Sequence, residues 1–312
     1  MKAHPALLHQ QYGVAVITAL LLTTLAVTIV ASLFWQQQVQ VRSIENQRLQ
    51  LQKQWILRGT LDWASLILRE DAKHSSVDTL DEPWAVPLAK TRLDEYVENG
   101  ARDTEASDAT LSGSISDAQA LFNLGNLSVN GIINPDEVAQ FERLLSGQNI
   151  DIKLAQATAD LIAAALKTPA NQTPEPAPQP LNLTQVDALL AVPGFTPAML
   201  VTLKPLVIFL PERTAINVNT APASVLAAKF NLASSDAAAL VKSRDTATFK
   251  DVADFNTRLP RRNLSATSNH ADVTTRFFLV NGSIQLGRAG MQVQALINRK
   301  VGQTQLVWIR EY

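Results

Sequence analysis

Side chains able to carry out acid–base or nucleophilic chemistry are few in this 312-residue sequence. The histidines are His4, His9, His74 and His270, and the last two stand among polar residues, where an ordinary solvated histidine is expected. Cysteine is absent, which excludes disulfides, thiolate metal sites and cysteine nucleophiles. The sequence also lacks HExxH, GxSxG, phosphate-loop and GxGxxG motifs. We therefore expect a protein that is not an enzyme.

A run of carboxylates between residues 81 and 110 is the stretch whose composition suits a metal ion. Calcium takes about six to eight oxygen ligands, and a cluster of this kind offers them, although its spacing matches no EF-hand loop. A run of charges is more often a solvated loop. Both interpretations stay open for Asp94, Glu95, Glu98, Asp103, Glu105 and Asp108.

Two segments resemble the helix-hairpin-helix modules of competence proteins that bind DNA. One is VPGFT (192–196), between two short helices, and the other is INVNTAP (216–222) with the later SRDTATFKDVADF (243–255). Such modules hold a phosphate with backbone amides at helix N-termini, helped by basic residues. Basic and acidic residues balance over 120–271, and the whole chain has a net charge of -1. We expect these hairpins simply to join short helices, with a membrane-tethered DNA-uptake receptor as an alternative.

The longest apolar run covers residues 14–35 and contains no charged side chain. A helix rises about 1.5 Å per residue, so this run matches a hydrocarbon core about 30 Å thick. The sequence has no second run of this length. We therefore expect a single transmembrane segment, with the large C-terminal part on one side of the membrane.

A short hydrophilic leader, residues 1–13, ends at Gly13 immediately before this run. The arrangement resembles a class III prepilin signal, which implies cleavage after Gly13 by a prepilin peptidase and a new, usually methylated, amine on Val14. Pilins carry Glu as the fifth residue after the cut, where its carboxylate is thought to pair with the amine of a neighbouring subunit. Here that residue is Thr18. A carboxylate in the bilayer is costly unless paired, so its loss is expected of a subunit that caps a filament and is assembled first.

The remaining elements follow from periodicity and from capping residues. We expect the N-terminal helix to continue to about Ala72, with a buried stripe of Leu49, Ile56, Trp63 and Ile67 flanked by Trp55 and Leu66. Short helices with caps at Asn134, Thr184 and Thr196 fill the middle of the chain, and a proline-rich connection covers 168–180. The C-terminal part of the chain is expected to form three strands separated by glycines.

Together these elements predict an α+β fold: a pilin-like long N-terminal transmembrane helix packed on a C-terminal antiparallel sheet, with a large inserted all-α domain of the SAM-like or helix-hairpin-helix-like type. The expected divisions of the chain are the leader 1–13, the transmembrane segment 14–35, a periplasmic helix and first part of the core 36–125, a first helical insert 126–215, a second helical insert 216–271, and the C-terminal strands 272–312.

The chain as a whole resembles the K-type minor pseudopilins of bacterial type II secretion systems. Besides Gly13 and Thr18, the likeness lies in LILREDAKHSSVDTLDEPWA (66–85), ISDAQALFNLGNL (115–127), TAINVNTAPASVLAA (214–228) and TTRFFL (274–279). It implies a subunit of the inner membrane, with its bulk in the periplasm, that caps the pseudopilus and initiates its assembly for export of folded proteins. A minor pilin of a type IV pilus is the related alternative.

The resemblance also implies partners. They are the I-type and J-type minor pseudopilins, prepilin peptidase and other inner-membrane components of the secretion system; no small-molecule substrate is expected. The residues expected to pack on partner helices are Val14, Ile17, Leu20, Leu21 and Leu25. Calcium is the one cofactor implied, but the segment matching the family's Asp-rich run, ADLIAAALKTPANQ (159–172), lacks those acids. Its ligands are therefore not identified.

Overall fold

The computed structural model describes residues 12–92, 109–166, 181–260, 266–286, 289–300 and 302–312. It divides into two compact units, Met1–Leu57 and Arg58–Tyr312, which are treated separately below. Most of the leader, the acidic residues between 94 and 108 and the proline-rich connection 168–180 lie outside the described residues.

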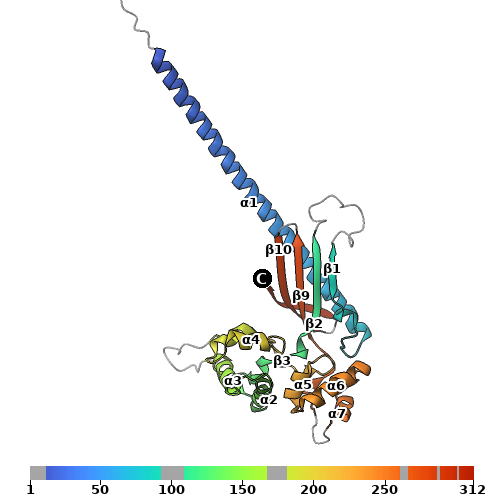
Figure 1. Cartoon of the computed structure of the whole chain (residues 1–312). Coiled ribbons are helices and arrows are strands. Elements are labelled where there is room, and N and C mark those ends of the chain that lie inside the picture. Colours follow the sequence, from blue (N-terminus) through green and yellow to red (C-terminus); the bar gives the residue numbers. More distant parts are fainter. Residues whose placement is uncertain (1–11, 93–108, 167–180, 261–265, 287–288, 301) are drawn as a thin grey trace, which may run out of the picture. The chain divides into compact units, whose positions relative to one another are not determined.

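A single helix, α1 (Tyr12–His74), contains the whole apolar run and continues into the second unit (Figure 1). Its 63 residues confirm the prediction of one continuous helix. It is long and apolar enough to cross a membrane. The hydroxyls of Thr23, Thr24 and Thr28 donate to carbonyl oxygens of the preceding turn at 2.8–3.0 Å. These threonines therefore bring no unsatisfied donor into an apolar medium.

The buried face of α1 within the second unit differs from the predicted stripe. Leu61, Ala64 and Leu68 are buried, whereas Trp63 is 41% exposed and Leu66 is 52% exposed. The predicted placement of Trp63 is therefore wrong. The spacing of the large apolar residues pointed to one side of the helix, but the small side chain of Ala64 faces inward instead, where it permits close packing.

Five strands form an antiparallel sheet with the order β1-β2-β9-β10-β11. They are β1 (Leu88–Arg92), β2 (Thr110–Asp117), β9 (Phe277–Leu286), β10 (Ala289–Lys300) and β11 (Gln303–Glu311). The last three confirm the predicted C-terminal meander. Strand β1 was not expected, because LAKTR lacks the apolar alternation of a half-buried strand.

The two faces of the sheet have different partners. Arg299 on β10 is paired with Asp71 on α1, and side chains alternate along a strand, so Met291, Val293, Ala295 and Ile297 lie on the same face as Arg299. This face is apolar and buried. On the opposite face, Phe277 and Leu296 join Ile208 and Leu210 in one buried cluster.

The chain between β2 and β9 forms the insert, whose first half follows the strand end at Asp117. It contains α2 (Pro135–Gly147) and α3 (Lys153–Leu166), preceded by the turns η4 (Ala118–Ala120) and η5 (Leu124–Leu127) and the two-residue strands β3 (Phe122–Asn123), β4 (Ser128–Val129) and β5 (Ile132–Ile133). The side chain of Asn134 accepts from the amide of Asp136 and caps α2, as predicted.

The second half of the insert contains the remaining short elements. They are η6 (Val186–Ala191), α4 (Pro197–Leu203), β6 (Val207–Ile208), β7 (Ile216–Asn217), α5 (Ala223–Phe230), α6 (Ser234–Thr246), α7 (Val252–Arg258) and β8 (Ala271–Asp272). Thr196 caps α4, as predicted. The predicted cap at Thr184 is wrong, because the element that follows is a 3-10 helix whose N-cap residue is Gln185.

The hairpin between η6 and α4 requires glycine. Gly194 has φ +108°, and a Cβ atom there would lie 2.8 Å from Cδ2 of Leu154 on α3. The glycine therefore lets the hairpin approach α3 closely. Its packing role agrees with the prediction that these turns join short helices.

One continuous cluster of buried side chains runs through the insert from Phe122 to Val273. Within it, Lys229 on α5 pairs with Glu137 on α2 at 2.7 Å, and both side chains are almost fully buried. The ammonium also lies 5.2 Å from the centre of the Phe122 ring. A buried ion pair of this kind fixes the approach of two helices more than it adds net stability.

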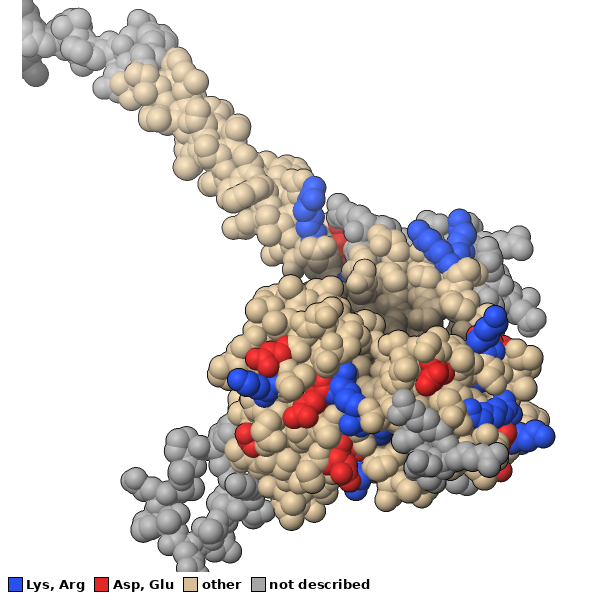
Figure 2. Space-filling view, turned by 60° about the horizontal axis from the view of Figure 1, so that its bottom comes forward, with Lys and Arg blue, Asp and Glu red and all other residues tan. Residues whose placement is uncertain are grey.

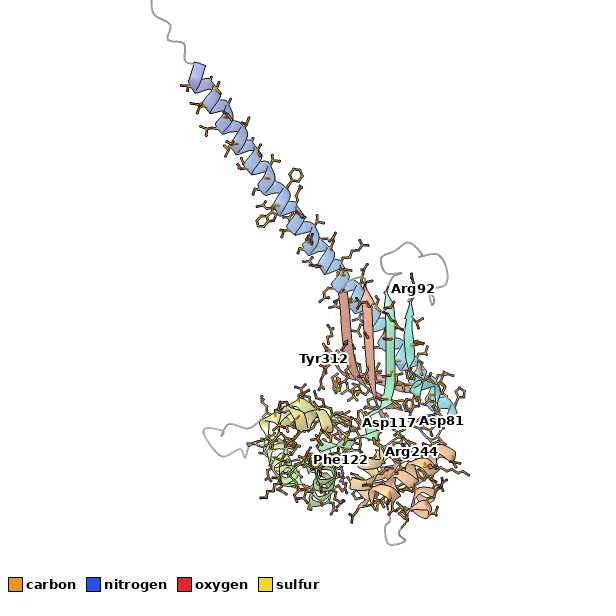
Figure 3. The ribbon with its side chains drawn as sticks, in the orientation of Figure 1. Asp81, Arg92, Asp117, Phe122, Arg244 and Tyr312 are labelled. Atoms are coloured by element: carbon orange, nitrogen blue, oxygen red, sulfur yellow. The ribbon has the colours of Figure 1, made fainter. Side chains whose placement is uncertain are left out.

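The surface of the Arg58–Tyr312 unit carries mixed charge. Figure 2 shows basic and acidic side chains interspersed over the visible face, without a broad patch of either sign. The sequence as a whole carries a net charge of -1. Figure 3 shows Asp117 where the sheet passes into the insert, with Phe122 and Arg244 among the insert elements.

Two leucines on α1 provide a test of the corrected face. Replacing Leu68, which is fully buried, with alanine should lower the free energy of unfolding by about 2–5 kcal/mol. Leu66→Ala is the matched control and should change it by less than about 0.5 kcal/mol. Urea unfolding followed by near-ultraviolet circular dichroism measures both, and equal losses would contradict the assignment of the face.

Candidate functional site

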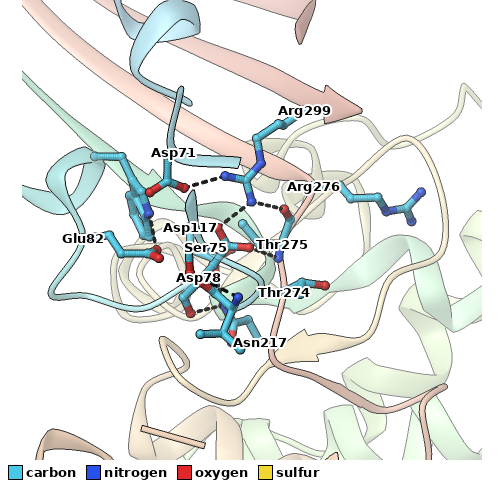
Figure 4. A network of polar contacts seen from close by, with 12 residues as sticks. Asp71, Ser75, Asp78, Glu82, Asp117, Asn217, Thr274, Thr275, Arg276 and Arg299 are labelled. Carbon is cyan, nitrogen blue, oxygen red and sulfur yellow. Dashed lines mark hydrogen bonds and ion pairs between the residues drawn. The ribbon is translucent and has the colours of Figure 1, made fainter. Parts of the chain in front are cut away.

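Polar side chains from α1, the sheet and the insert meet around the buried carboxylate of Asp117, at the C-terminal end of β2. We call this group the junction network. Figure 4 shows it from close by, and Arg299 enters it from β10. The members that contact one another are Asp71, Asp78, Asp117, Asn217, Thr220, Thr275 and Arg299.

Asp117 is the centre of the network, and its carboxylate accepts four hydrogen bonds. One oxygen accepts from the amide of Gln119 at 2.7 Å and from the hydroxyl of Thr275 at 2.6 Å. The other accepts from the side-chain amide of Asn217 at 2.9 Å and from the hydroxyl of Thr220 at 2.6 Å. Gln119 lies at the start of the insert, Asn217 and Thr220 lie in and just after β7, and Thr275 lies just before β9. A single carboxylate therefore ties these segments together.

Arg299 connects the sheet to the end of α1. Its guanidinium donates to Asp71 at 2.8 Å, to Asp78, and to the carbonyl of Thr275 at 3.0 Å. It also lies 4.6 Å from the centre of the Phe278 ring. The arginine side chain is only 10% exposed, so its charge depends on these two carboxylates for compensation.

Asp78 completes the connection with both its backbone and its side chain. Its amide donates to the carbonyl of Val273 at 2.8 Å, and its carbonyl accepts from the side chain of Asn217 at 3.0 Å. Its carboxylate accepts from the amide of Thr275 at 2.6 Å. The segment after α1 is thereby bonded to the residues that enter β9.

Burial dominates the electrostatics of these acids. It raises the pKa of Asp117 to about 6, although the hydrogen bonds from Thr220, Thr275 and Asn217 act to lower it. Burial and the charge of Glu82 raise the pKa of Asp71 to about 6, against the opposing effect of Arg299. The pKa of Asp78 is also raised, chiefly by burial. The network therefore takes up protons in mildly acidic solution.

Asp71 and Asp78 of the network, with the neighbouring Glu82, do not fit a calcium site. Carboxylate oxygens of Asp71, Asp78 and Glu82 lie within 4.8 Å of one another. Arg299 already occupies the first two, and Glu82 accepts from the amide of Thr79 and the indole of Trp84 at 2.9 and 2.8 Å. A cation there would be repelled by the positive charge of Arg299, and its binding would break the hydrogen bonds that these carboxylates already accept. Calcium stays a prediction, and its acidic cluster at 94–108 lies outside the described residues.

The residues predicted for membrane and assembly functions lie on α1, apart from this network. Gly13 is the second residue of the helix, and Val14, Ile17, Leu20, Leu21 and Leu25 are all more than half exposed. The hydroxyl of Thr18 donates to the carbonyls of Val14 and Ala15 at 3.0 Å. These residues offer an apolar surface within the Met1–Leu57 unit.

The two histidines in the described part of the chain take no part in the network. His74 is exposed, as predicted, and lies 3.2 Å from a carboxylate oxygen of Glu70. His270 is partly buried rather than fully solvated, and burial lowers its pKa.

The segments that build the network were singled out from the sequence, but the contacts between them were not predicted. Asp71, Asp78, Asp117 and Thr275 all lie in the four segments that carried the family resemblance. Arg299 was missed. Its one local signal is a charged residue continuing the alternation of Val293, Ala295 and Ile297 on a face expected to be buried.

Removing the network's arginine should be costly. Arg299→Met leaves two carboxylates without their cation and should lower the free energy of unfolding by about 3–5 kcal/mol. Arg276→Met is the matched control, because Arg276 is 51% exposed in its pair with Glu212, and should cost about 0–1 kcal/mol. Urea unfolding at neutral pH measures both; an Arg299 effect no larger than the control would contradict the assigned role.

The titration of Asp117 has a defined sign. Its pKa is about 6 in the folded chain and about 4 when unfolded, so the folded state holds an extra proton between these values. The contribution of Asp117 to the free energy of unfolding should therefore fall as pH rises from about 4 to about 6, and stay constant above. Urea unfolding of the natural chain and Asp117→Asn across this range isolates it. A difference that grows with pH would mean that the four hydrogen bonds outweigh burial.

Comparison with known proteins agrees with this architecture. Family models described as "Type II secretion system (T2SS), protein K" match residues 120–212 and 216–274. Type II secretion system protein K of Pseudomonas aeruginosa is 30% identical over 318 residues, which cover 95% of this chain and 92% of the relative. The protein of the same name from Klebsiella pneumoniae is 27% identical, covering 97% of each chain.

A solved structure has the same fold. It is a chain of the crystal structure of the GspK-GspI-GspJ complex from the type 2 secretion system of enterotoxigenic Escherichia coli, with a TM-score of 0.66 and 21% identity. The match covers 87% of this chain and 99% of that chain. The α+β architecture of helix, antiparallel sheet and insert is thereby confirmed. The likeness to the Pseudomonas aeruginosa protein extends over nearly the whole length of both chains, and α1 is the one described helix that could cross a membrane. This chain therefore belongs to the family of type II secretion system protein K, the minor pseudopilins of that system, as a single-pass, membrane-anchored member.

Proposed function

We propose that this chain caps the tip of the periplasmic pseudopilus and initiates its assembly for the export of folded proteins across the outer membrane. The observation that carries the proposal is the combination of protein K family membership with a threonine, and no acid, at position 18 of an apolar run without charged residues. In this proposal the large Arg58–Tyr312 unit lies in the periplasm, and α1 anchors it in the inner membrane.

Thr18 supports a position at the end of a filament. Its hydroxyl is bonded within its own helix, so the side chain has no need of a partner in the apolar medium. A glutamate at this position would require a cation to compensate it. A subunit with no neighbour above it would meet no such cation, and threonine suits that position.

The proposed partners are the I-type and J-type minor pseudopilins, prepilin peptidase and other inner-membrane components of the secretion system. The related solved structure is of a complex with proteins named GspI and GspJ. The proposed contact surface on this chain is Val14, Ile17, Leu20, Leu21 and Leu25, whose side chains are exposed along α1. The family match favours this role over a minor pilin of a type IV pilus or a DNA-uptake receptor.

Processing provides the direct test. Expressed with its cognate prepilin peptidase, the chain should lose residues 1–13 and begin at Val14, whose amine should carry a methyl group. Mass spectrometry of the purified protein, with and without the peptidase, measures this. Gly13→Leu should block the cut, because glycine alone lets the backbone enter a narrow active site without a Cβ atom; Gly59→Leu is a control glycine elsewhere on α1 with no atom near its Cβ position.

The same proteins test the role in export. A strain lacking the chain should fail to secrete its folded substrates and should recover with the natural sequence but not with Gly13→Leu. The processed chain should also copurify with the I-type and J-type subunits. Retention of Met1 in the presence of the peptidase, or rescue by Gly13→Leu, would contradict the proposal.

A further inference from the structure

The face of the sheet turned away from α1 is organised in three cross-strand rows. The first row, Ser116, Leu279, Leu296 and Trp308, is largely apolar and joins the cluster formed with the insert strand β6. The next two rows are polar: Ser114, Asn281, Gln294 and Arg310, and then Ser112, Ser283, Gln292 and Tyr312. The insert therefore covers only the apolar part of this face.

The polar rows form the floor of a cavity of about 580 Å³. Its walls come from the insert, where apolar side chains such as Val207 and Phe209 stand beside Thr184 and Gln185. The wall also contains the ion pair of Lys204 with Asp187, whose charged atoms lie 2.7 Å apart. This volume is within the usual range for sites that enclose a small ligand. All the lining residues belong to the Arg58–Tyr312 unit, so the cavity is a feature of that unit alone.

The hydrogen-bonding capacity of the floor lies in its side chains. The backbone groups of β9 and β10 are used by the ladders on both sides. Apart from Arg310 and Tyr312, the side chains of the floor are serines, asparagine and glutamines, whose hydroxyls and amides both donate and accept and carry no charge. Gln294 donates to Asn281 at 2.9 Å, which fixes the orientation of two of these amides.

One end of the floor adds an aromatic surface. Trp308 lines this cavity and also a second one, of about 400 Å³. The guanidinium of Arg310 lies 4.0 Å from the centre of the tryptophan ring and donates to the carbonyl of Thr184 at 3.1 Å. Arg310 thus braces the ring, and its charge is engaged with the ring and a carbonyl.

We propose that this cavity binds a neutral, hydroxyl-rich oligosaccharide. Sugar hydroxyls donate and accept at once, as do the amides and hydroxyls of the floor, so each can replace its bonds to water with bonds to the protein. The apolar C–H face of a sugar ring packs on an aromatic ring, and Trp308 borders the polar rows; Arg310 covers one face of its ring, so the sugar would contact the remaining surface of the indole. The lining residues of the cavity do not include any residue of the proposed assembly surface on α1.

Other ligand classes fit the cavity less well. An extended polypeptide gains most of its affinity by adding a strand to a free sheet edge, whereas most of this floor is the face of β2, β9 and β10, which are paired on both sides; only the last strand of the floor, β11, lies at an edge of the sheet. A multiply charged anion needs several unpaired cations, but Lys204 is paired with Asp187 and Arg310 is engaged with Trp308. A neutral polyol matches the donors and acceptors that remain.

The test uses the full chain in a polyoxyethylene detergent, which has no sugar headgroup to compete. Isothermal titration calorimetry with chitotetraose, cellotetraose and maltotetraose should give saturable binding for at least one of them. The comparison ligands are tetragalacturonate and an uncharged peptide of ten residues. Neither comparison ligand should show saturable binding. Binding of the neutral tetrasaccharide should not change with salt concentration.

Variants then place the ligand. Gln292→Ala with Gln294→Ala, and separately Trp308→Phe, should weaken binding at least about tenfold. Gln285→Ala is the control, since it lies on the same face of β9 but outside the cavity. Circular dichroism shows whether each variant is folded; Gln292 is exposed, so its single replacement by alanine keeps the test valid if Trp308→Phe fails to fold.

Three results would overturn the proposal. They are no saturation by any of the three neutral tetrasaccharides, tighter binding of the peptide or of tetragalacturonate, and equal weakening by Gln285→Ala and by the cavity variants. The last would mean that the sugar binds elsewhere on the chain.

Discussion

The burial of one carboxylate, that of Asp117, is the constraint on which the second unit depends. Asp117 ends β2 and accepts from Gln119 where the insert begins, from Asn217 and Thr220 in and just after β7, and from Thr275 just before β9. A fully buried charge is tolerated only when its acceptor positions are satisfied. The chain must therefore leave and re-enter the sheet at one place, whatever the intervening sequence does. An insert of many short helices can be accommodated because its entry and exit are bonded to the same group.

The junction network supplies specificity, and the apolar clusters supply most of the stability. Replacing a buried ion pair with apolar groups often costs nothing, so Arg299 and its two carboxylates are better understood as fixing the geometry of α1, sheet and insert. The continuous cluster of the insert, and the smaller one that joins Ile208 and Leu210 to Phe277 and Leu296, provide burial on both sides of the junction. The polar network thus selects one arrangement among those that the apolar surfaces alone would allow.

Local features of this fold could be predicted from the sequence, and contacts between distant segments could not. An apolar run without charge fixes a helix, and Asn134 before Pro135 fixes the start of another, because each signal acts within a few residues. The glycine-bounded strands β9 to β11 follow for the same reason. The inward face of α1 depends instead on what packs against it. The large apolar side chain of Trp63 led to the wrong prediction that it is buried, whereas the small Ala64 faces the core. Arg299 is more than two hundred residues from Asp71, and no local pattern announces their pairing.

Polar groups that lie away from water are hydrogen-bonded in both units, but their partners come from different parts of the chain. In the Arg58–Tyr312 unit, acids are buried only where several donors from distant segments converge, and this demands a complete tertiary structure. In the apolar stretch of α1, the threonine hydroxyls bond to carbonyls of their own helix, so that stretch needs no tertiary partner to be stable in an apolar medium. Helix association there is then governed by the shape of exposed apolar side chains. A charged residue at position 18 would need a neighbouring subunit to compensate its charge, whereas threonine allows the helix to be stable in the membrane without a partner.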